Sequence, residues 1–470
     1  MSDKDLIDVK ELAPAEVAEV DLYQRREKIY TRHIEGFFQR IRLFTGWPLL
    51  AGYFLLPWLT WDGRPAVLFD LPARKFHILG LTFWPQDFPL LAFLLIIAAF
   101  ALFTVTAFAG RLWCGYTCPQ TVWTSIFMWI EQRFEGSRNQ RMKLDQAPWS
   151  AEKALRKGLK HGGWLFVAFA TGATFVGYFY PIRDLLWEFL TLSSGKWQVL
   201  WTLFFTCATY INAGWMREQV CTYMCPYARF QSVMFDRDTL IVSYDPGRGE
   251  PRGSRRRDVD PRALGLGDCI DCELCVQVCP TGIDIREGLQ YECIGCALCI
   301  DACNSVMDKM SYPRGLIRYT SERALEGEQT HWLRPRVIGY TLVLLVMAGL
   351  FSWRILDRTP LEMTVIRDRT ELYVTTQDGS VENIYTLSVA NMDEAAHEFE
   401  VSLEGLPGAS LIGETRHTVD AGEVRRITLR VREPAGNANT PATVVEFRLQ
   451  STDQRELEIS SESRFMRPMS

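Results

Sequence analysis

Histidine, nucleotide-binding motifs and net charge are all scarce in this sequence. Six histidines are scattered over 470 residues, and no CxxC pair is followed by histidine, which removes support for covalent c-type haem. No glycine-rich dinucleotide fingerprint or other nucleotide motif occurs, so NAD(P)H or a flavin would have to act through another protein. The net charge of −5 gives no reason to expect a nucleic-acid partner.

Cysteine is confined to one part of the chain. All thirteen cysteines lie between Cys114 and Cys303, and they are too few for a disulfide scaffold. The stretch from Met1 to about Asp21 is acidic and polar and lacks the basic region, apolar stretch and cleavage site of a signal peptide. We therefore expect no cleavable signal peptide, and we expect the cysteines to serve as ligands or redox groups within residues 114–303.

Long uncharged runs fill much of the first half. A membrane-crossing helix needs roughly 20 apolar residues, and each run is about that long. Buried helices of a soluble core are the alternative. The runs cover residues 43–61, 88–110, 162–182, 197–216 and 337–353. They predict an α-helical transmembrane bundle of about five spans, with four spans in a membrane domain at 43–244 and the fifth helix at 337–354.

Lysine and arginine in the connecting loops indicate the orientation, because cytoplasmic loops are enriched in both. Two segments are strongly basic. The segment before the first run contains Arg25, Arg26, Lys28, Arg32, Arg40 and Arg42, and the loop after the second run contains Arg133, Arg138, Arg141, Lys143, Lys153, Arg156, Lys157 and Lys160. The segment 1–42 should then be cytoplasmic. The uncharged stretch 112–130 would reverse this topology as a sixth span. We therefore predict a turn followed by an interfacial or re-entrant helix on the cytoplasmic side, in contact with membrane lipid.

Two further regions follow from composition. Residues 245–267 are rich in Pro, Gly and Arg and read as a linker. From residue 361 onward, short β-rich segments alternate with turn residues, at 363–365, 372–376, 384–390, 399–403, 426–431, 444–449 and 457–460. This pattern predicts an all-β, immunoglobulin-like sandwich over 361–470, exported to the periplasm by the fifth span of a bacterial inner-membrane protein.

The strongest motif is a repeated run of four cysteines. Cys269, Cys272, Cys275 and Cys279 follow CxxCxxCxxxCP spacing, and Cys293, Cys296, Cys299 and Cys303 repeat it with Asn304 in place of the proline. In such modules three cysteines of a run bind one cluster and the fourth binds the other. The spacing predicts a ferredoxin-like domain at 268–320 with two 4Fe-4S clusters. One is held by Cys269, Cys272, Cys275 and Cys303, the other by Cys279, Cys293, Cys296 and Cys299.

Two structural zinc sites are the alternative for these eight cysteines, but zinc sites do not call for two identical four-cysteine runs. Because all eight cysteines are used as ligands, no open iron position is evident. The module therefore predicts electron relay, with the ferredoxin-like domain on the cytoplasmic side of the membrane.

A second cysteine pattern occurs twice. Cys114 and Cys118 form one CxxxCP motif, Cys221 and Cys225 form another, and an Ala-Gly step precedes each. This indicates a duplicated helical hairpin. Sulfurs four residues apart can share one helix face, so the motifs could form a four-thiolate site or two dithiol switches. Soft thiolates favour Cu(I), and the thioether of Met224 lies nearby. Simple packing of these cysteines at helix ends is the alternative, and Cys207 is read as such a packing residue.

This combination resembles the FixG/RdxA/CcoG family of accessory proteins for cbb3-type cytochrome c oxidase. The resemblance is carried by residues 114–120, 221–227 and 269–303 and by the β-rich tail. It implies a cupric reductase that converts Cu(II) to Cu(I), with a copper ion at the CxxxCP cysteines as catalytic residues. It also implies a copper chaperone or an immature oxidase as partner, and an immunoglobulin-like C-terminal domain.

Three hypotheses follow. The first is the cupric reductase, supplied by an unidentified cytoplasmic electron donor. The second is a quinone-linked membrane electron conduit, because the CxxxCP and dicluster segments also resemble the wider polyferredoxin group. The third is a non-catalytic oxidase assembly scaffold, which would not need eight ligand cysteines.

Overall fold

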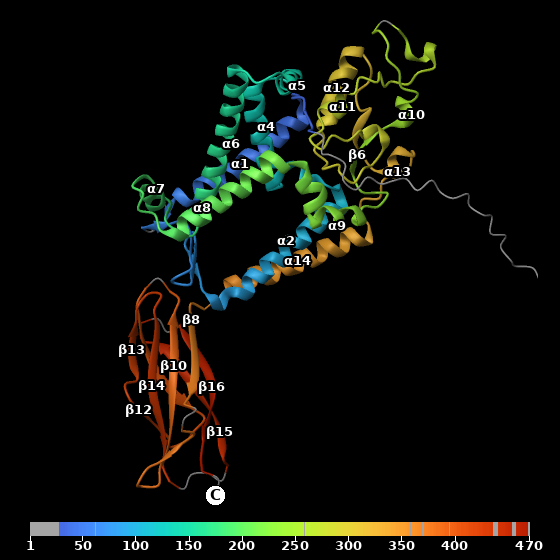
Figure 1. Ribbon diagram of the computed structural model, residues 1–470. Coiled ribbons are helices and arrows are strands. Elements are labelled where there is room, and N and C mark those ends of the chain that lie inside the picture. The colour runs from blue at the N-terminus through green and yellow to red at the C-terminus, as the bar shows by residue number, and fades with distance from the viewer. Residues whose placement is uncertain are drawn as a thin grey trace, which may run out of the picture. The chain divides into compact units, whose positions relative to one another are not determined.

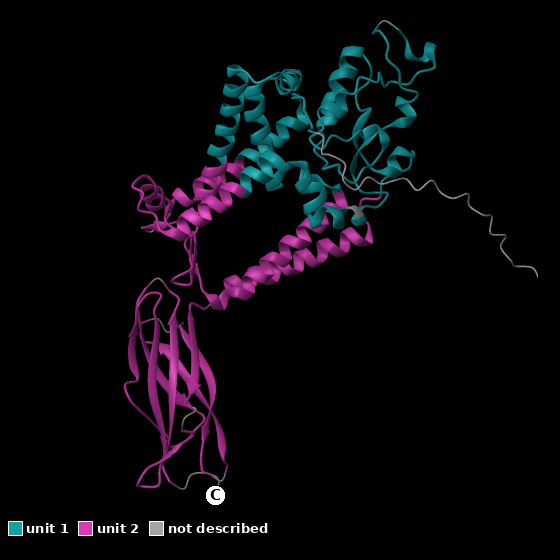
Figure 2. Cartoon of the chain, in the orientation of Figure 1, with its two compact units in different colours: residues 1–47, 109–167, 208–330 teal, residues 48–108, 168–207, 331–470 magenta. Residues whose placement is uncertain are grey.

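The computed structural model describes residues 28–61, 63–257, 259–357, 359–368, 371–393, 395–435, 440–453 and 457–468. The chain divides into two compact units, coloured separately in Figure 2. Unit 1 contains residues 1–47, 109–167 and 208–330, and unit 2 contains 48–108, 168–207 and 331–470. Residues 1–27 lie outside the described residues. They include the acidic start of the chain, on which the signal-peptide prediction rests, and Arg25 and Arg26.

A helix forms in each of the five predicted apolar runs. These helices are α1 (Phe37–Leu55), α2 (Phe88–Ala109), α6 (Ala151–Gly177), α8 (Lys196–Thr209) and α14 (Pro335–Leu356), all visible in Figure 1. Among the described residues, two helices are long and apolar enough to cross a membrane, one over 85–109 and one over Pro335–Leu356. The structure therefore supports two candidate spans of the five predicted.

The other three helices fail this test for identifiable reasons. Helix α1 begins with a polar stretch that includes Gln39, Arg40 and Arg42, which lowers its hydropathy. Helix α6 begins with a basic stretch that includes Lys153, Arg156 and Lys157. Helix α8 ends after 14 residues and continues as a π-helix, η3 (Tyr210–Met216).

Unit 2 also contains small elements that the apolar runs do not predict. A short 3-10 helix, η1 (Leu56–Trp58), follows α1, and β1 (Thr60–Trp61) pairs with β2 (Arg64–Pro65). Strands β3 (Val67–Asp70), β4 (Lys75–Ile78) and β5 (Leu81–Phe83) form an antiparallel sheet, followed by η2 (Pro85–Asp87). Helix α7 (Ile182–Leu190) connects α6 to α8.

In unit 1, the stretch 112–130 is not one continuous helix. It comprises α3 (Leu112–Tyr116) and the start of α4 (Pro119–Glu135), and α5 (Arg138–Gln146) follows. The second CxxxCP segment lies on a further π-helix, η4 (Val220–Met224), and precedes α9 (Pro226–Met234). Both α4 and α9 begin with a proline directly after a cysteine, where proline's fixed φ and missing N–H suit the first helical position.

The ferredoxin-like module begins earlier than predicted. Strand β6 (Ile241–Tyr244) pairs with β7 (Ile317–Thr320), so residues 241–320 form one module around α11 (Leu274–Gln277), η6 (Ile285–Glu287) and α12 (Leu298–Met310). The predicted linker 245–267 is therefore wrong as a boundary. It carries α10 (Pro246–Gly249) and η5 (Pro261–Leu264), and the Gly253 N–H donates to the Cys269 carbonyl at 3.2 Å. Helix α13 (Glu322–Leu325) follows the module.

The C-terminal region is an antiparallel sandwich, as predicted. One sheet has the order β12-β14-β10-β8 with β9 on β10, and the other has the order β13-β11-β15-β16. The strands are β8 (Leu361–Arg367), β9 (Val374–Thr375), β10 (Val381–Asn391), β11 (His397–Glu404), β12 (Ser410–Ile412), β13 (Arg416–Val419), β14 (Val424–Glu433), β15 (Ala442–Ser451) and β16 (Glu458–Met466). All seven predicted strands are present, and β12 and β13 are additional.

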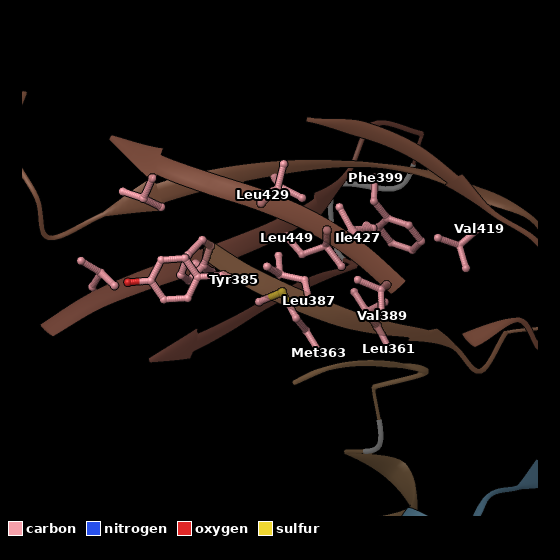
Figure 3. Close-up of a cluster of buried hydrophobic side chains, with 14 of the residues drawn as sticks. Leu361, Met363, Tyr385, Leu387, Val389, Phe399, Val419, Ile427, Leu429 and Leu449 are labelled. Carbon is pink, nitrogen blue, oxygen red and sulfur yellow. The ribbon is translucent and has the colours of Figure 1, made fainter. Parts of the chain in front are cut away.

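The core of the sandwich explains its stability without cysteine. Alternate residues of β10, Tyr385, Leu387 and Val389, point inward and are fully buried (Figure 3). They pack in one cluster with Phe399 of β11 and Leu449 of β15. Period-two burial of this kind is what a strand with one face on a core requires.

Candidate metal centres

Each of the two predicted ligand sets lines its own cavity in unit 1. The lining of the first cavity includes Cys269, Cys272, Cys275 and Cys303. The lining of the second includes Cys279, Cys293, Cys296 and Cys299, and Cys275 borders it as well. The fold thus brings the fourth cysteine of each run to the other run's cavity, and these cysteines fit two 4Fe-4S clusters.

The backbone of the two loops is shaped in the same way. The residues on either side of the middle cysteine have positive φ in both loops, at Asp271 and Glu273 in the first and at Gly295 and Ala297 in the second. Residues other than glycine rarely adopt this conformation. The repeated left-handed pair curves each loop around its cavity. No group of three or more His, Cys, Asp or Glu side chains in the described chain is placed to hold a single metal ion.

Exposure distinguishes the two cavities. Of the eight cysteines, Cys272 alone is exposed, whereas Cys269, Cys275 and Cys296 are buried. Burial raises the pKa of Cys275, Cys293 and Cys303 to about 12. All thirteen cysteines belong to the described residues, and none forms a disulfide.

The two CxxxCP motifs are brought together through Cys114 and Cys221. Cys114 and Cys221 pack against one apolar cluster that also contains Cys296 of the second cavity. The pKa of Cys114 is raised to about 12, mainly by burial and further by Cys118, Cys221 and Cys225. Burial, Cys118 and Cys225 likewise raise the pKa of Cys221 to about 12. Both thiols therefore carry protons when no metal is bound.

The second CxxxCP motif also lies beside the fourth ligand of the second cavity. A small depression is lined by Cys221 and by Pro280 and Thr281, which directly follow Cys279. The hydroxyl of Thr281 lies 3.2 Å from the Cys279 sulfur. By contrast, the Met224 side chain is 56% exposed, and Cys207 is exposed rather than packed as predicted.

The first CxxxCP motif is packed directly on the loop of the second cavity. A Cβ atom at Gly115 would lie 2.8 Å from the Gly295 carbonyl oxygen and 2.9 Å from the Cys296 Cα atom. Only glycine permits this approach of two backbones. The Tyr319 hydroxyl donates to the Gly295 carbonyl at 2.6 Å and lies 3.3 Å from the Tyr116 hydroxyl.

Two arginines that the motifs did not predict complete this contact. Arg111 donates to the carbonyls of Cys293 and Ala228 at 3.3 and 2.6 Å. Arg42 donates from Nε to the Gly115 carbonyl at 3.0 Å. The only sequence signal for Arg111 was its place directly after the Ala-Gly step, and Arg42 was read as a topology signal alone.

Three family models match parts of the chain. A "4Fe-4S dicluster domain" matches residues 216–322, and a "4Fe-4S binding domain" matches residues 91–136. An "IG-like fold at C-terminal of FixG", whose description also carries the term oxidoreductase, matches residues 351–468.

Curated relatives extend over nearly the whole chain. "Nitrogen fixation protein FixG" of Rhizobium meliloti is 38% identical over 447 residues, covering 87% of this chain and 85% of the relative. "Protein RdxA" of Cereibacter sphaeroides is 38% identical and covers 92% and 95%, and "Protein RdxB" of the same organism is 39% identical and covers 90% and 92%. The chain belongs to the FixG/RdxA/RdxB family.

Membership of the FixG/RdxA/RdxB family confirms the resemblance drawn from the cysteine motifs and the β-rich tail. A solved structure titled "Crystal structure of FixG-related protein from Vibrio parahaemolyticus" aligns with 23% of this chain and 98% of that chain, at 31% identity and a TM-score of 0.22. The family models make this chain an iron–sulfur protein with 4Fe-4S binding domains.

Proposed function

We propose that this FixG/RdxA/RdxB-family protein is a membrane-anchored cupric reductase. Electrons from a cytoplasmic donor pass through two 4Fe-4S clusters and reduce Cu(II) to Cu(I) at Cys114, Cys118, Cys221 and Cys225. The observation that supports this path best is the close backbone packing of Gly115 on Gly295 and Cys296, which leaves no room for even a methyl group at Gly115.

The chain's own residues have separate roles in this proposal. The linings of the two cavities support Cys269, Cys272, Cys275 and Cys303 as ligands of one cluster and Cys279, Cys293, Cys296 and Cys299 as ligands of the other. When bound, the clusters supply one-electron transfer, and each Cu(II) consumes one electron. Thiolates prefer Cu(I), so the CxxxCP cysteines favour the reduced product, and the protons of Cys114 and Cys221 are released when the metal binds.

Location and partners belong to the same proposal. The candidate spans α2 and α14 would anchor the protein in membrane lipid of the inner membrane, with the ferredoxin-like module cytoplasmic and the sandwich periplasmic. The Cu(I) produced would pass to a copper chaperone or to an immature cbb3-type oxidase.

Substitution of the four CxxxCP cysteines tests the proposal. The quadruple Cys→Ser variant at 114, 118, 221 and 225 should lose Cu(II) reduction while the EPR signals of two clusters remain. Cys207→Ser is the matched control, since Cys207 is exposed on α8 and belongs to neither motif. Full copper reduction by the quadruple variant would refute the assignment of these cysteines.

One observation favours a second function. The "4Fe-4S binding domain" model matches residues 91–136, which contain Cys114 and Cys118 but none of the eight cysteines of the 269–303 repeat. The four CxxxCP cysteines would then hold a third cluster, and the protein would be an electron conduit, for example to quinone. Iron analysis separates the two: about eight iron atoms per chain fit the reductase, and about twelve fit the conduit.

A further inference from the structure

Each cluster cavity has a buried arginine beside it, but the two are neutralised differently. Arg286 lines the first cavity, and its side chain is 7% exposed. It forms ion pairs with Asp271 and Asp284, both at 2.5 Å. The charge of Arg286 is therefore matched by two carboxylates. The other arginine at this cavity, Arg255, donates to the Cys269 carbonyl at 3.3 Å but is partly exposed, so solvent screens its charge.

The arginines at the second cavity have no such partners. Arg111 is 6% exposed, and its described partners are the carbonyls of Cys293 and Ala228 and the ring of Tyr291, whose centroid lies 5.1 Å away. Arg42 is 9% exposed and donates to the Gly115 carbonyl and the Ser125 hydroxyl. In the part of the chain that the structure describes, neither guanidinium forms an ion pair.

The nearby acid is already engaged. Asp301, buried on α12, accepts hydrogen bonds from the backbone N–H groups of Phe38 and Gln39 at 3.2 and 2.8 Å. Arg111 donates to the backbone carbonyl of Cys293, and Arg42 donates to the carbonyl of Gly115, whose backbone packs against Cys296. Both positive charges therefore lie beside ligands of the second cavity.

A buried cation without a counter-ion is costly unless negative charge is supplied near it. Addition of an electron to a cluster supplies such charge, and the low dielectric of the interior strengthens the attraction. Cluster reduction potentials respond to local charge, hydrogen bonding and solvent exposure. The second cavity should therefore favour its reduced state more than the first.

We infer that Arg111, assisted by Arg42, makes the cluster of the second cavity the more easily reduced of the two and so directs electrons toward the CxxxCP cysteines. This rests on the proposed ligand sets and electron path. One electron moves from the first cluster, beside exposed Cys272, to the second, which packs against Gly115. The arginines keep their protons throughout and act as positioned charges.

Redox titration of the full-length detergent-solubilised protein, followed by EPR, tests this inference without copper. Arg111→Gln should lower the midpoint potential of the higher-potential cluster by about 59 mV. This corresponds to a tenfold change in the equilibrium constant of its one-electron reduction. Arg111→Lys should retain most of the wild-type potential. Arg314→Gln, which removes an exposed arginine paired with Asp308 in the same module, should change neither potential.

Two outcomes would overturn the inference. One is an unchanged upper potential in Arg111→Gln with both clusters present. If Arg111 variants do not fold, Cys272→Ser in the otherwise unaltered protein provides the second test, because it alters the EPR signal of the exposed cluster. Appearance of that altered signal in the higher-potential step would overturn the inference. A potential shift without any copper reduction would leave this inference intact and refute the cupric reductase, whereas copper reduction with unchanged potentials would do the reverse.

Discussion

The two CxxxCP segments have the same spacing but different surroundings. In the first, Cys114–Cys118, Tyr116 is 6% exposed and Gly115 contacts the second cluster loop. In the second, Cys221–Cys225, the matching tyrosine, Tyr223, is 68% exposed, and Met224 is 56% exposed. A duplicated motif has thus given one segment that is packed on the ferredoxin-like module and one with an open side.

The difference arises from the residues that precede each motif. The step from Gly110 to Cys114 is three residues shorter than the step from Gly214 to Cys221. The longer step is accommodated by the π-helices η3 and η4, a feature that often marks functional sites. In the proposed reductase, this difference would suit the first segment to receiving electrons and the second to admitting the metal.

The largest expected effect concerns Glu131, whose carboxylate pairs with the arginine before the second motif. The buried Glu131 Oε2 atom lies 2.9 Å from a guanidinium nitrogen of Arg217 and 3.1 Å from one of Arg141. Burial alone would raise the pKa of Glu131, but Arg217 and Arg141 hold it below its usual range. Glu131→Gln should destabilise the protein by about 3–5 kcal/mol, because it leaves buried cations without a counter-charge. Chemical unfolding at neutral pH measures this cost.

The sign of the pH dependence follows from the lowered pKa. The ionised carboxylate stabilises the fold above the unfolded-state pKa, and this contribution is lost as the pH falls through the lower folded-state pKa. The difference between wild type and Glu131→Gln should therefore shrink in acid. A difference that grows in acid would contradict the ion-pair account.

Gly115→Ala should have the next largest effect. The added methyl would meet the backbone of Gly295 and Cys296, which cannot turn aside like a flexible side chain, at a cost of about 1–3 kcal/mol. Reduced iron content and a lower melting temperature are expected. Thr222→Ala at the matching position of the second segment is the control. An equal loss of iron and an equal fall in melting temperature in this variant would show that the two segments do not differ in their packing.

Tyr116→Phe should cost about 1 kcal/mol, since it removes a hydroxyl buried against the Tyr319 hydroxyl. Tyr223→Phe should leave the free energy of unfolding unchanged, because that side chain is exposed. Equal unfolding curves for the two variants would show that the first segment is not held by this contact.

Met224→Leu should have the smallest effect. Loss of a thioether at the open segment should raise the Cu(II) concentration at half-maximal rate by roughly threefold without altering stability. Thr117→Val, at the matching position of the first segment, should leave that concentration unchanged. A larger effect of Thr117→Val would place metal entry at the first segment instead.

The sequence predicted the elements whose signal is local. Cysteine spacing indicated both ligand sets, and short β-rich segments between turn residues indicated seven strands of the sandwich, including those that carry Tyr385 and Phe399. What it could not predict depends on contacts between distant segments. The pairing of β6 with β7 places residues 245–267 inside the module, and Arg111 and Arg42 owe their importance to neighbours far away in the sequence. The length of α8 was misjudged because hydropathy does not distinguish an α-helix from a π-helix.

The exposure of Cys272 has a consequence for handling the protein. Oxygen and peroxide reach an exposed cluster edge more readily than a buried one, so we expect damage in air to begin at the first cavity. The second cavity, none of whose four cysteines is exposed, should keep its cluster longer. Aerobic purification should therefore yield protein that has lost the cluster of the first cavity and retains the cluster of the second.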